Sequence, residues 1–206
     1  MASMKPGPLG VGANTPMIDK GTLALTAMPV PGPIGITPSS QIRKLSLADN
    51  ARLYEIRKLV QNNNRSTLDE NVVICQIYME SRFDARTGAG HDAKGLMQLQ
   101  LNAVQQVYKY RKLKELKHMP SDEVTAEAFK EAKELHKSPL IMDEATNIQI
   151  GTEYMQYWLD TTSTIEDAYK KYRGQTNGIY YRKIKAAADK LSNNPQSMQI
   201  LLEMVQ

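Results

Sequence analysis

The sequence contains few of the residues that form disulfides and metal sites. Its 206 residues include one cysteine and three histidines. A single cysteine excludes an internal disulfide and a multi-cysteine zinc site, and the apolar neighbours of Cys75 predict a small buried hydrophobic residue. The histidines show no metal-ligand spacing, so we expect them at the surface: His91, His118 and His136. The sequence therefore predicts no metal and no other cofactor.

Long apolar segments are also missing. No stretch reaches the roughly 20 apolar residues that a membrane-spanning helix needs, so we expect no stable membrane insertion. The most apolar stretch near the N-terminus runs from 23 to 30, and prolines at 29, 31 and 33 interrupt and follow it. A secretory signal needs an uninterrupted apolar region. The sequence thus contains no clear general export signal.

Neither sign of charge dominates. The net charge is +4 and the isoelectric point is near 9.0, which suits an anionic partner such as a cell-wall polymer, nucleic acid or lipid surface but selects none of them. Basic residues are scattered among acidic ones, and no aromatic platform or known nucleic-acid motif accompanies them. We therefore expect no nucleic-acid partner.

Prolines and glycines are concentrated at one end of the chain. Residues 1–40 hold 7 of the 10 prolines and 6 of the 12 glycines. Proline removes backbone donors and glycine loosens the backbone, so such a segment does not favour helix. We predict a Pro/Gly-rich leader at 1–45, extended or weakly ordered, and one folded domain at 46–206.

From residue 46 onward the apolar residues recur with a helical period. The predicted helices cover 46–60, 68–81, 100–118, 122–137, 143–160, 164–173, 178–192 and 196–205. Thr67 and Glu70 form a predicted capping box, and Ser121 and Thr164 are predicted N-caps. No alternating strand pattern is present. The predicted fold is all-α, with at most a very small β element after Phe83.

Glu80 stands out because of its neighbours. It closes the apolar run 72–79, in the helix predicted to be the most buried. Burial disfavours a charged carboxylate and is therefore expected to raise the pKa of Glu80. Such a carboxylic acid can donate a proton to a glycosidic oxygen near neutral pH. Fifteen residues later, 95–98 read Gly-Leu-Met-Gln, where the glycine allows close backbone approach and Gln98 offers a donor and an acceptor to a sugar.

Three short patterns resemble the catalytic core of the lytic transglycosylases, relatives of goose-type lysozyme. The first is Glu-Ser-x-Phe at 80–83, followed at the family's interval by Gly-Leu-Met-Gln at 95–98. The second is Asn-Ile-x-x-Gly-x-x-Tyr at 147–154. The third is Ala-x-x-x-Tyr at 168–172, after which a tyrosine-bearing helix follows. The resemblance extends over 68–190 and implies a lysozyme-like helical domain.

The resemblance also implies a reaction and a set of site residues. Enzymes of this family cut the β-1,4 bond between N-acetylmuramic acid and N-acetylglucosamine in peptidoglycan glycan strands and leave 1,6-anhydro ends. Glu80 is the implied catalytic acid and base. We expect a hydroxyl near its carboxyl group from Tyr172, and a cleft floor shaped by Met97. The implied substrate contacts are Ser81, Gln98, Met97, Tyr154 and Tyr172.

The chain departs from the family pattern in two main places. Arg173 and Gly174 replace the usual Asn-Ala, which changes a contact near the N-acetyl group of the substrate. Residues 109–142 form a longer and more charged connection than is usual. We interpret this stretch as a helical insertion that is either simply solvated, or a lid or surface for the wall or a partner.

Two alternative functions remain open from the sequence. A hydrolytic muramidase would need a second carboxylate to activate water, and Asp92 and Asp84 lie in a loop that could supply it. A non-catalytic wall-binding component of a secretion machine would keep the fold without cleavage. Because an enzyme of this kind acts on the wall in the periplasm, we expect export by a specialised secretion system. Its expected protein partners are that apparatus or a cognate immunity protein.

Overall fold

The computed structural model describes residues 47–206 and is all-α over that range. The predicted leader at 1–45 lies outside the described residues. Within 47–206 the helices are α1 (Leu47–Asn63), α2 (Glu70–Ser81), α3 (Leu101–Leu116), α4 (Asp122–Lys137), the short 3₁₀ helix η1 (Pro139–Met142), α5 (Glu144–Thr161), α6 (Ile165–Arg173), α7 (Ile179–Asn193) and α8 (Met198–Met204). These bounds confirm the helices predicted from the sequence. None of the helices in this part of the chain is long and apolar enough to cross a bilayer.

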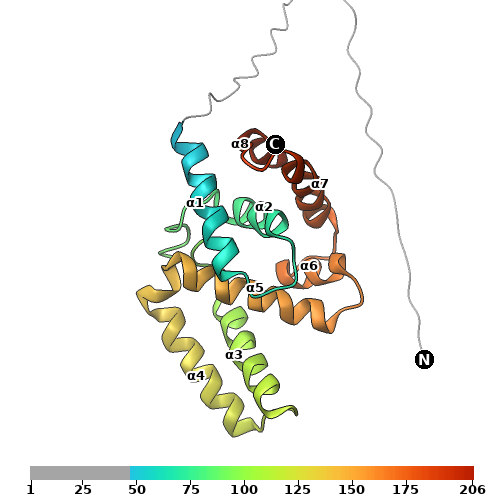
Figure 1. The fold of residues 1–206 in the computed structure, drawn as a ribbon. Helices are drawn as coiled ribbons and strands as arrows, with labels where there is room; N and C mark the ends of the chain where they lie inside the picture. Colours follow the sequence, from blue (N-terminus) through green and yellow to red (C-terminus); the bar gives the residue numbers. More distant parts are fainter. Residues whose placement is uncertain (1–46) are drawn as a thin grey trace, which may run out of the picture. The chain divides into compact units, whose positions relative to one another are not determined.

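Helix α2 is the most enclosed element because its side chains are apolar on nearly every face. It contacts α1, α7 and α8, and Figure 1 shows it in the middle of that group. Cys75, Ile74 and Ile77 are fully buried. Burial raises the pKa of the Cys75 thiol to about 12, so the group stays a neutral thiol at physiological pH. The prediction that Cys75 is a small buried hydrophobic residue is confirmed.

The predicted capping box at the start of α2 is wrong. The N-cap is Asp69, whose carboxylate accepts a hydrogen bond from the amide of Asn71 at 2.8 Å. The Glu70 carboxylate accepts hydrogen bonds from Arg57 and Gln61 of α1, and not from the backbone amide of Thr67. Partners on a neighbouring helix therefore replace the local contact. The other two predicted caps are confirmed by the structure, at the first turns of α4 and α6.

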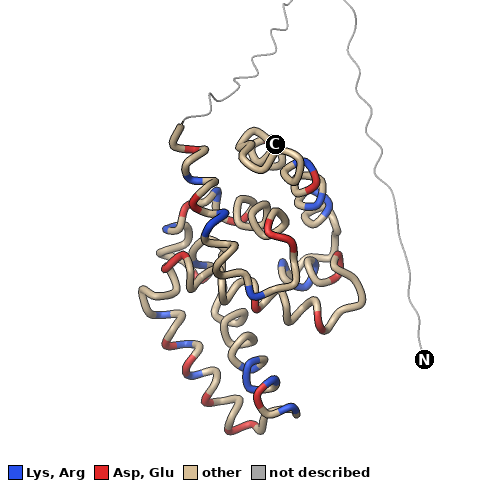
Figure 2. The backbone as a smooth tube through the Cα atoms, viewed as in Figure 1, with Lys and Arg blue, Asp and Glu red and all other residues tan. Residues whose placement is uncertain are grey.

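Helices α3 and α4 form an antiparallel hairpin that extends away from the other helices (Figure 1). The apolar stripe of α4, at Ala128 and Ala132, is buried. Figure 2 shows basic residues on the C-terminal half of α3 and both signs of charge along α4. This hairpin contains most of the predicted insertion at 109–142.

One histidine lies in a different environment from the one predicted. His91 and His118 are exposed as expected, but His136 is buried at the end of α4. Its Nε2 lies 2.9 Å from the carbonyl oxygen of Asp92 and 3.2 Å from that of Leu99. The surface prediction for His136 is therefore wrong, because the end of the hairpin packs onto the loop that follows α2.

That loop contains the small β element expected after residue 83. Lys94 and Leu99 form an isolated antiparallel bridge, with backbone hydrogen bonds of 3.1 and 2.9 Å. The side chain of Lys94 also donates to the carbonyl oxygen of His136 at 2.8 Å. The bridge closes the Gly-Leu-Met-Gln turn, and the hairpin end holds it in place.

Candidate active site

Glu80 occupies the last turn of α2. The chain leaves this helix through two residues with positive φ, Arg82 at 56° and Phe83 at 66°. Arg52 of α1 donates to the carbonyl oxygen of Phe83 at 2.9 Å and is paired with Glu144 of α5. These contacts fix the strained exit from the helix. The Glu80 side chain, in the turn just before this exit, is only 7% exposed.

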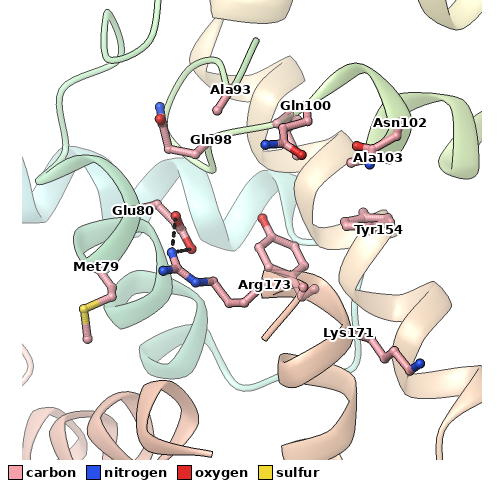
Figure 3. A pocket seen from close by; sticks show the side chains of 13 residues that line it. Met79, Glu80, Ala93, Gln98, Gln100, Asn102, Ala103, Tyr154, Lys171 and Arg173 are labelled. Atoms are coloured by element: carbon pink, nitrogen blue, oxygen red, sulfur yellow. Dashed lines mark hydrogen bonds and ion pairs between the residues drawn. The ribbon is translucent and has the colours of Figure 1, made fainter. Parts of the chain in front are cut away.

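The Glu80 carboxylate opens into a cleft of about 490 Å³. The lining combines side chains from α2, the Gly-Leu-Met-Gln turn, the start of α3, and helices α5 and α6 (Figure 3). The residues that line it are Met79, Glu80, Ala93, Gln98, Leu99, Gln100, Asn102, Ala103, Tyr154, Lys171, Tyr172, Arg173 and Gly174. Glu80 is the single carboxylate among them. The amides of Gln98, Gln100 and Asn102 are the kinds of group that hydrogen-bond sugar hydroxyl and N-acetyl groups.

Two side chains bind the Glu80 carboxylate directly. Nη1 of Arg173 donates to both carboxylate oxygens, at 3.2 Å from Oε1 and 3.1 Å from Oε2. The Tyr180 hydroxyl of α7 donates to Oε1 at 2.5 Å. Figure 3 shows the guanidinium of Arg173 turned toward Glu80, while Lys171 lies farther along the cleft.

Tyr180 is held as a hydrogen-bond donor. Burial, and next the nearby Glu80 carboxylate, raise the pKa of Tyr180 well above its ordinary value, so its hydroxyl keeps its proton. The Arg173 guanidinium lies 4.6 Å from the centre of the Tyr180 ring, which orients both side chains. The Tyr180 ring in turn contacts Tyr169. Together these contacts form a rigid donor pair around one carboxylate.

The second sequence pattern holds the first in place through Asn147. This buried side chain accepts a hydrogen bond from the amide of Met97 at 2.8 Å and donates to the carbonyl oxygens of Lys94 and Ile141 at 3.0 and 2.8 Å. Gly95 has a φ of 72°, and a Cβ there would lie 2.3 Å from Nδ2 of Asn147. The close backbone approach expected at Gly95 is thus confirmed. Asn147 of the second pattern therefore packs directly against Gly95 and Met97 of the Gly-Leu-Met-Gln turn.

Gly151 of α5 provides a second contact between the same two patterns. A Cβ at this position would lie 2.4 Å from Sδ and 2.8 Å from Cβ of Met97. Met97 is fully buried and fills the space that the missing side chain leaves. The Gly-Leu-Met-Gln turn therefore sits directly on α5, which places Gln98 at the cleft.

Gly151→Ala should destabilise the domain by about 1–2 kcal/mol. Alanine gains about 1 kcal/mol of helix propensity, but overpacking against Met97 costs up to about 3 kcal/mol. Urea unfolding followed by circular dichroism measures the difference. Gly90→Ala is the matched control, because a Cβ there meets nothing within 4 Å; its effect should stay within about 0.5 kcal/mol. Equal effects of the two substitutions would reject the proposed close contact.

The structure brings three of the predicted contact residues to the cleft, which are Gln98, Tyr154 and Tyr172. The amide nitrogen of Gln98 donates to carbonyl oxygens of its own loop, at Thr87 and Gly95, so its acceptor oxygen is the group left for a ligand. The Tyr172 hydroxyl donates to the carbonyl oxygen of Met97 at 2.9 Å. The prediction that Tyr172 places its hydroxyl on the Glu80 carboxylate is therefore wrong, and Tyr180 provides that hydroxyl.

Two other predicted contact residues do not line the cleft. Ser81 is buried, and its hydroxyl donates to the carbonyl oxygen of Ile77 at 3.1 Å in its own helix. Met97 lies in the layer beneath the cleft, where it supports the floor without reaching the opening. The prediction that Ser81 and Met97 contact the substrate directly is therefore wrong. Ser81 faces the interior at the end of α2, and Met97 packs against Gly151 below the cleft.

Neither acidic loop residue lines the cleft with Glu80. Asp84 is exposed and contacts its neighbour Arg86, while the side chain of Asp92 is 62% exposed and lies 3.8 Å from the ring of His136. No residue of 109–142 is among those that line the cleft, in the described part of the chain. The end of α4 supports the loop through His136, and the roles of 109–142 as a lid or as a surface for a partner stay predictions.

The sequence patterns do not reveal several residues that the structure brings to the cleft or to the Glu80 carboxylate. In the sequence Arg173 is only a departure from a family pattern, and Gln100 and Asn102 belong to none of the three patterns. Tyr180 has a signal, since it lies in the helix that follows the third pattern, but its target is 100 residues away in sequence. That distance is closed only by the contact of α7 with α2.

Comparison of the chain with protein-family models, with curated proteins and with solved structures finds no match. Within residues 47–206, no group of three or more histidine, cysteine, aspartate or glutamate residues is arranged to hold a metal ion. The chemistry of the cleft therefore has to be inferred from its own residues. They provide one enclosed carboxylate, two donors on that carboxylate, and a wall of amide and tyrosine side chains.

Proposed function

We propose that this protein is a peptidoglycan lytic transglycosylase with Glu80 as its catalytic acid and base. The observation that carries the proposal is a single carboxylate, 7% exposed, that opens into a cleft lined by amides and tyrosines. An enclosed carboxyl group of this kind suits proton transfer to and from a sugar. Within residues 47–206 no second carboxylate lines the cleft, which favours this reaction over an inverting hydrolysis that needs one.

The proposed reaction uses Glu80 twice. In its protonated form it donates the proton to the glycosidic oxygen, the bond from that oxygen to C1 of the muramic residue breaks, and the leaving sugar takes the proton as its 4-hydroxyl. The N-acetyl oxygen of the muramic residue stabilises the positive charge at C1. The Glu80 carboxylate then takes the proton of the C6 hydroxyl as O6 bonds to C1. The anhydro ring closes without water, and Glu80 is protonated again.

Tyr180→Phe should lower the rate of this reaction about tenfold while leaving the fold intact. The substitution removes the hydroxyl that holds Oε1 of Glu80 and keeps the ring under Arg173. Loss of one hydrogen bond to a charged group amounts to about 1.5–3 kcal/mol. Tyr181→Phe on the same helix is the control, since the Tyr181 ring stacks on Tyr169 and it is the Tyr180 hydroxyl that donates to Glu80. Turnover of purified peptidoglycan measures both. Equal rates for the two variants would reject a role for Tyr180.

The proposed function is tested by the chemistry of the product ends. Purified peptidoglycan is incubated with the protein, and the released fragments are identified by mass spectrometry. 1,6-Anhydro-muramyl ends are the expected result. Reducing ends would make the protein a hydrolytic muramidase and require a base from outside the cleft lining. The absence of fragments from a folded protein would leave a non-catalytic wall-binding role.

The proposed site of action is the cell wall, with delivery by a specialised secretion system that reads the leader at 1–45. The motivating observation is the proline- and glycine-rich composition of residues 1–40. Removal of the leader should stop export and leave cleavage of purified wall unchanged; unchanged export would reject this role. A cognate immunity protein, if one exists, should block the cleft that contains Glu80.

A further inference from the structure

The ion pair in the cleft has one enclosed and one accessible member. The side chain of Glu80 is 7% exposed, whereas that of Arg173 is 32% exposed. A guanidinium carries five N–H donors. In residues 47–206 its protein hydrogen bonds come only from Nη1, to the two oxygens of Glu80. The remaining donors of Arg173 are thus available to a ligand in the cleft.

The cleft has an excess of positive charge. Lys171 and Arg173 both belong to its lining, and among the described residues Glu80 is the single acidic group there. Arg173 is also held in position, since its guanidinium stacks on the Tyr180 ring at 4.6 Å. A guanidinium that is already oriented binds a planar carboxylate well, because two of its N–H groups match the two oxygens.

We infer that Arg173 binds a carboxylate of the glycan substrate beside the bond that is cut, through the donors that do not contact Glu80. This inference rests on the proposed function and names the substrate class, which is a glycan with an acidic group on its muramic residue. Two sources carry that group: the free lactyl carboxylate of a strand without peptide, and the acidic residues of an attached peptide stem. A neutral chitin-type glycan offers neither.

Binding measurements on inactive protein test the inference without depending on cleavage. The probes are a peptide-free tetrasaccharide of alternating N-acetylglucosamine and N-acetylmuramic acid and a neutral chitotetraose, titrated by calorimetry. The proteins are full-length Glu80→Gln and the double variant with Arg173→Asn. The acidic probe should bind the double variant at least about tenfold more weakly, because a charge-assisted pair is lost. The neutral probe should bind both within about twofold.

Two further variants control for charge and folding. Arg182→Asn in the Glu80→Gln background removes one positive charge from an exposed position of α7 that does not line the cleft, and should keep the preference for the acidic probe. Arg173→Lys keeps the charge and loses the paired donors, so it should retain part of the preference. Melting curves establish that each variant is folded. An equal affinity ratio for the two probes in folded Glu80→Gln and its Arg173→Asn double variant would reject the lactyl carboxylate. Together with equal cleavage of stem-bearing strands by wild type and Arg173→Asn, it would overturn the inference.

Cleavage assays distinguish the source of the carboxylate and separate the two proposals. Arg173→Asn is compared with wild type on stem-bearing strands and on strands stripped of peptide. A loss of about tenfold on stripped strands identifies the lactyl carboxylate, and a loss confined to stem-bearing strands identifies the stem. Equal rates for both proteins on both substrates would overturn the inference and leave the proposed function standing. An Arg173-dependent preference for the acidic probe in protein that releases no fragments would support the carboxylate site and reject the proposed function.

Discussion

Glu80→Gln is expected to lower the rate of anhydro-end formation by about 10²- to 10⁴-fold. Glutamine has nearly the same shape but cannot give or take the proton, and a general acid or base of this kind contributes about that factor. Both proton transfers of the proposed reaction pass through this one carboxyl group, and no other carboxylate lines the cleft in the described part of the chain. The measurement is the initial rate of fragment release from purified peptidoglycan, with mass spectrometry of the ends.

The matched control for this prediction is Glu123→Gln. It makes the same chemical change in the first turn of α4, at an exposed position that does not line the cleft. Its rate should equal that of wild type. The Glu80 variant should remain folded, because the side chain keeps its volume and can still accept from Tyr180. Wild-type activity in folded Glu80→Gln would remove Glu80 from the mechanism and with it the proposed reaction.

Asn147→Ala is expected to destabilise the domain by about 3 kcal/mol or more. The substitution leaves one buried amide, at Met97, and two carbonyl oxygens, at Lys94 and Ile141, without their side-chain partner. A buried polar group that loses its partner costs about 1–3 kcal/mol. For a domain of this size the melting temperature should fall by roughly 10 °C. Urea unfolding and a thermal melt measure the loss.

Two comparisons make the test specific to the Asn147 contacts. Asn102→Ala is the same substitution at an exposed position of α3 and should change stability by no more than about 0.5 kcal/mol. Asn147→Asp keeps an acceptor for the Met97 amide but replaces the donor group with charge against two carbonyl oxygens, so it should be at least as harmful as alanine. A loss below about 1 kcal/mol for Asn147→Ala would show that the turn is held by other contacts.

The positions of the helices could be predicted from the sequence because their signals are local. The apolar period and the side chains of Ser121 and Thr164 act within one or two turns of the chain, and the structure places α4 and α6 accordingly. Thr67 and Glu70 carry an equally good local signal and do not form the cap. Their alternative partners lie on other helices, since Gln156 accepts from the Thr67 amide and Arg57 binds Glu70. Local reasoning fails where a distant partner competes.

The same distinction applies to the cleft. By itself the sequence determined that Glu80 ends an apolar helix, and that a glycine turn follows at a spacing that brings it near. The tertiary structure alone decided which groups touch the carboxylate, because Arg173 and Tyr180 are 93 and 100 residues away from it in sequence. It also turned Ser81 inward and left Asp84 and Asp92 outside the cleft lining. The chemistry of an enclosed carboxylate depends on the donors and acceptors around it in space, and those are set by the contacts of α6 and α7 with the rest of the domain.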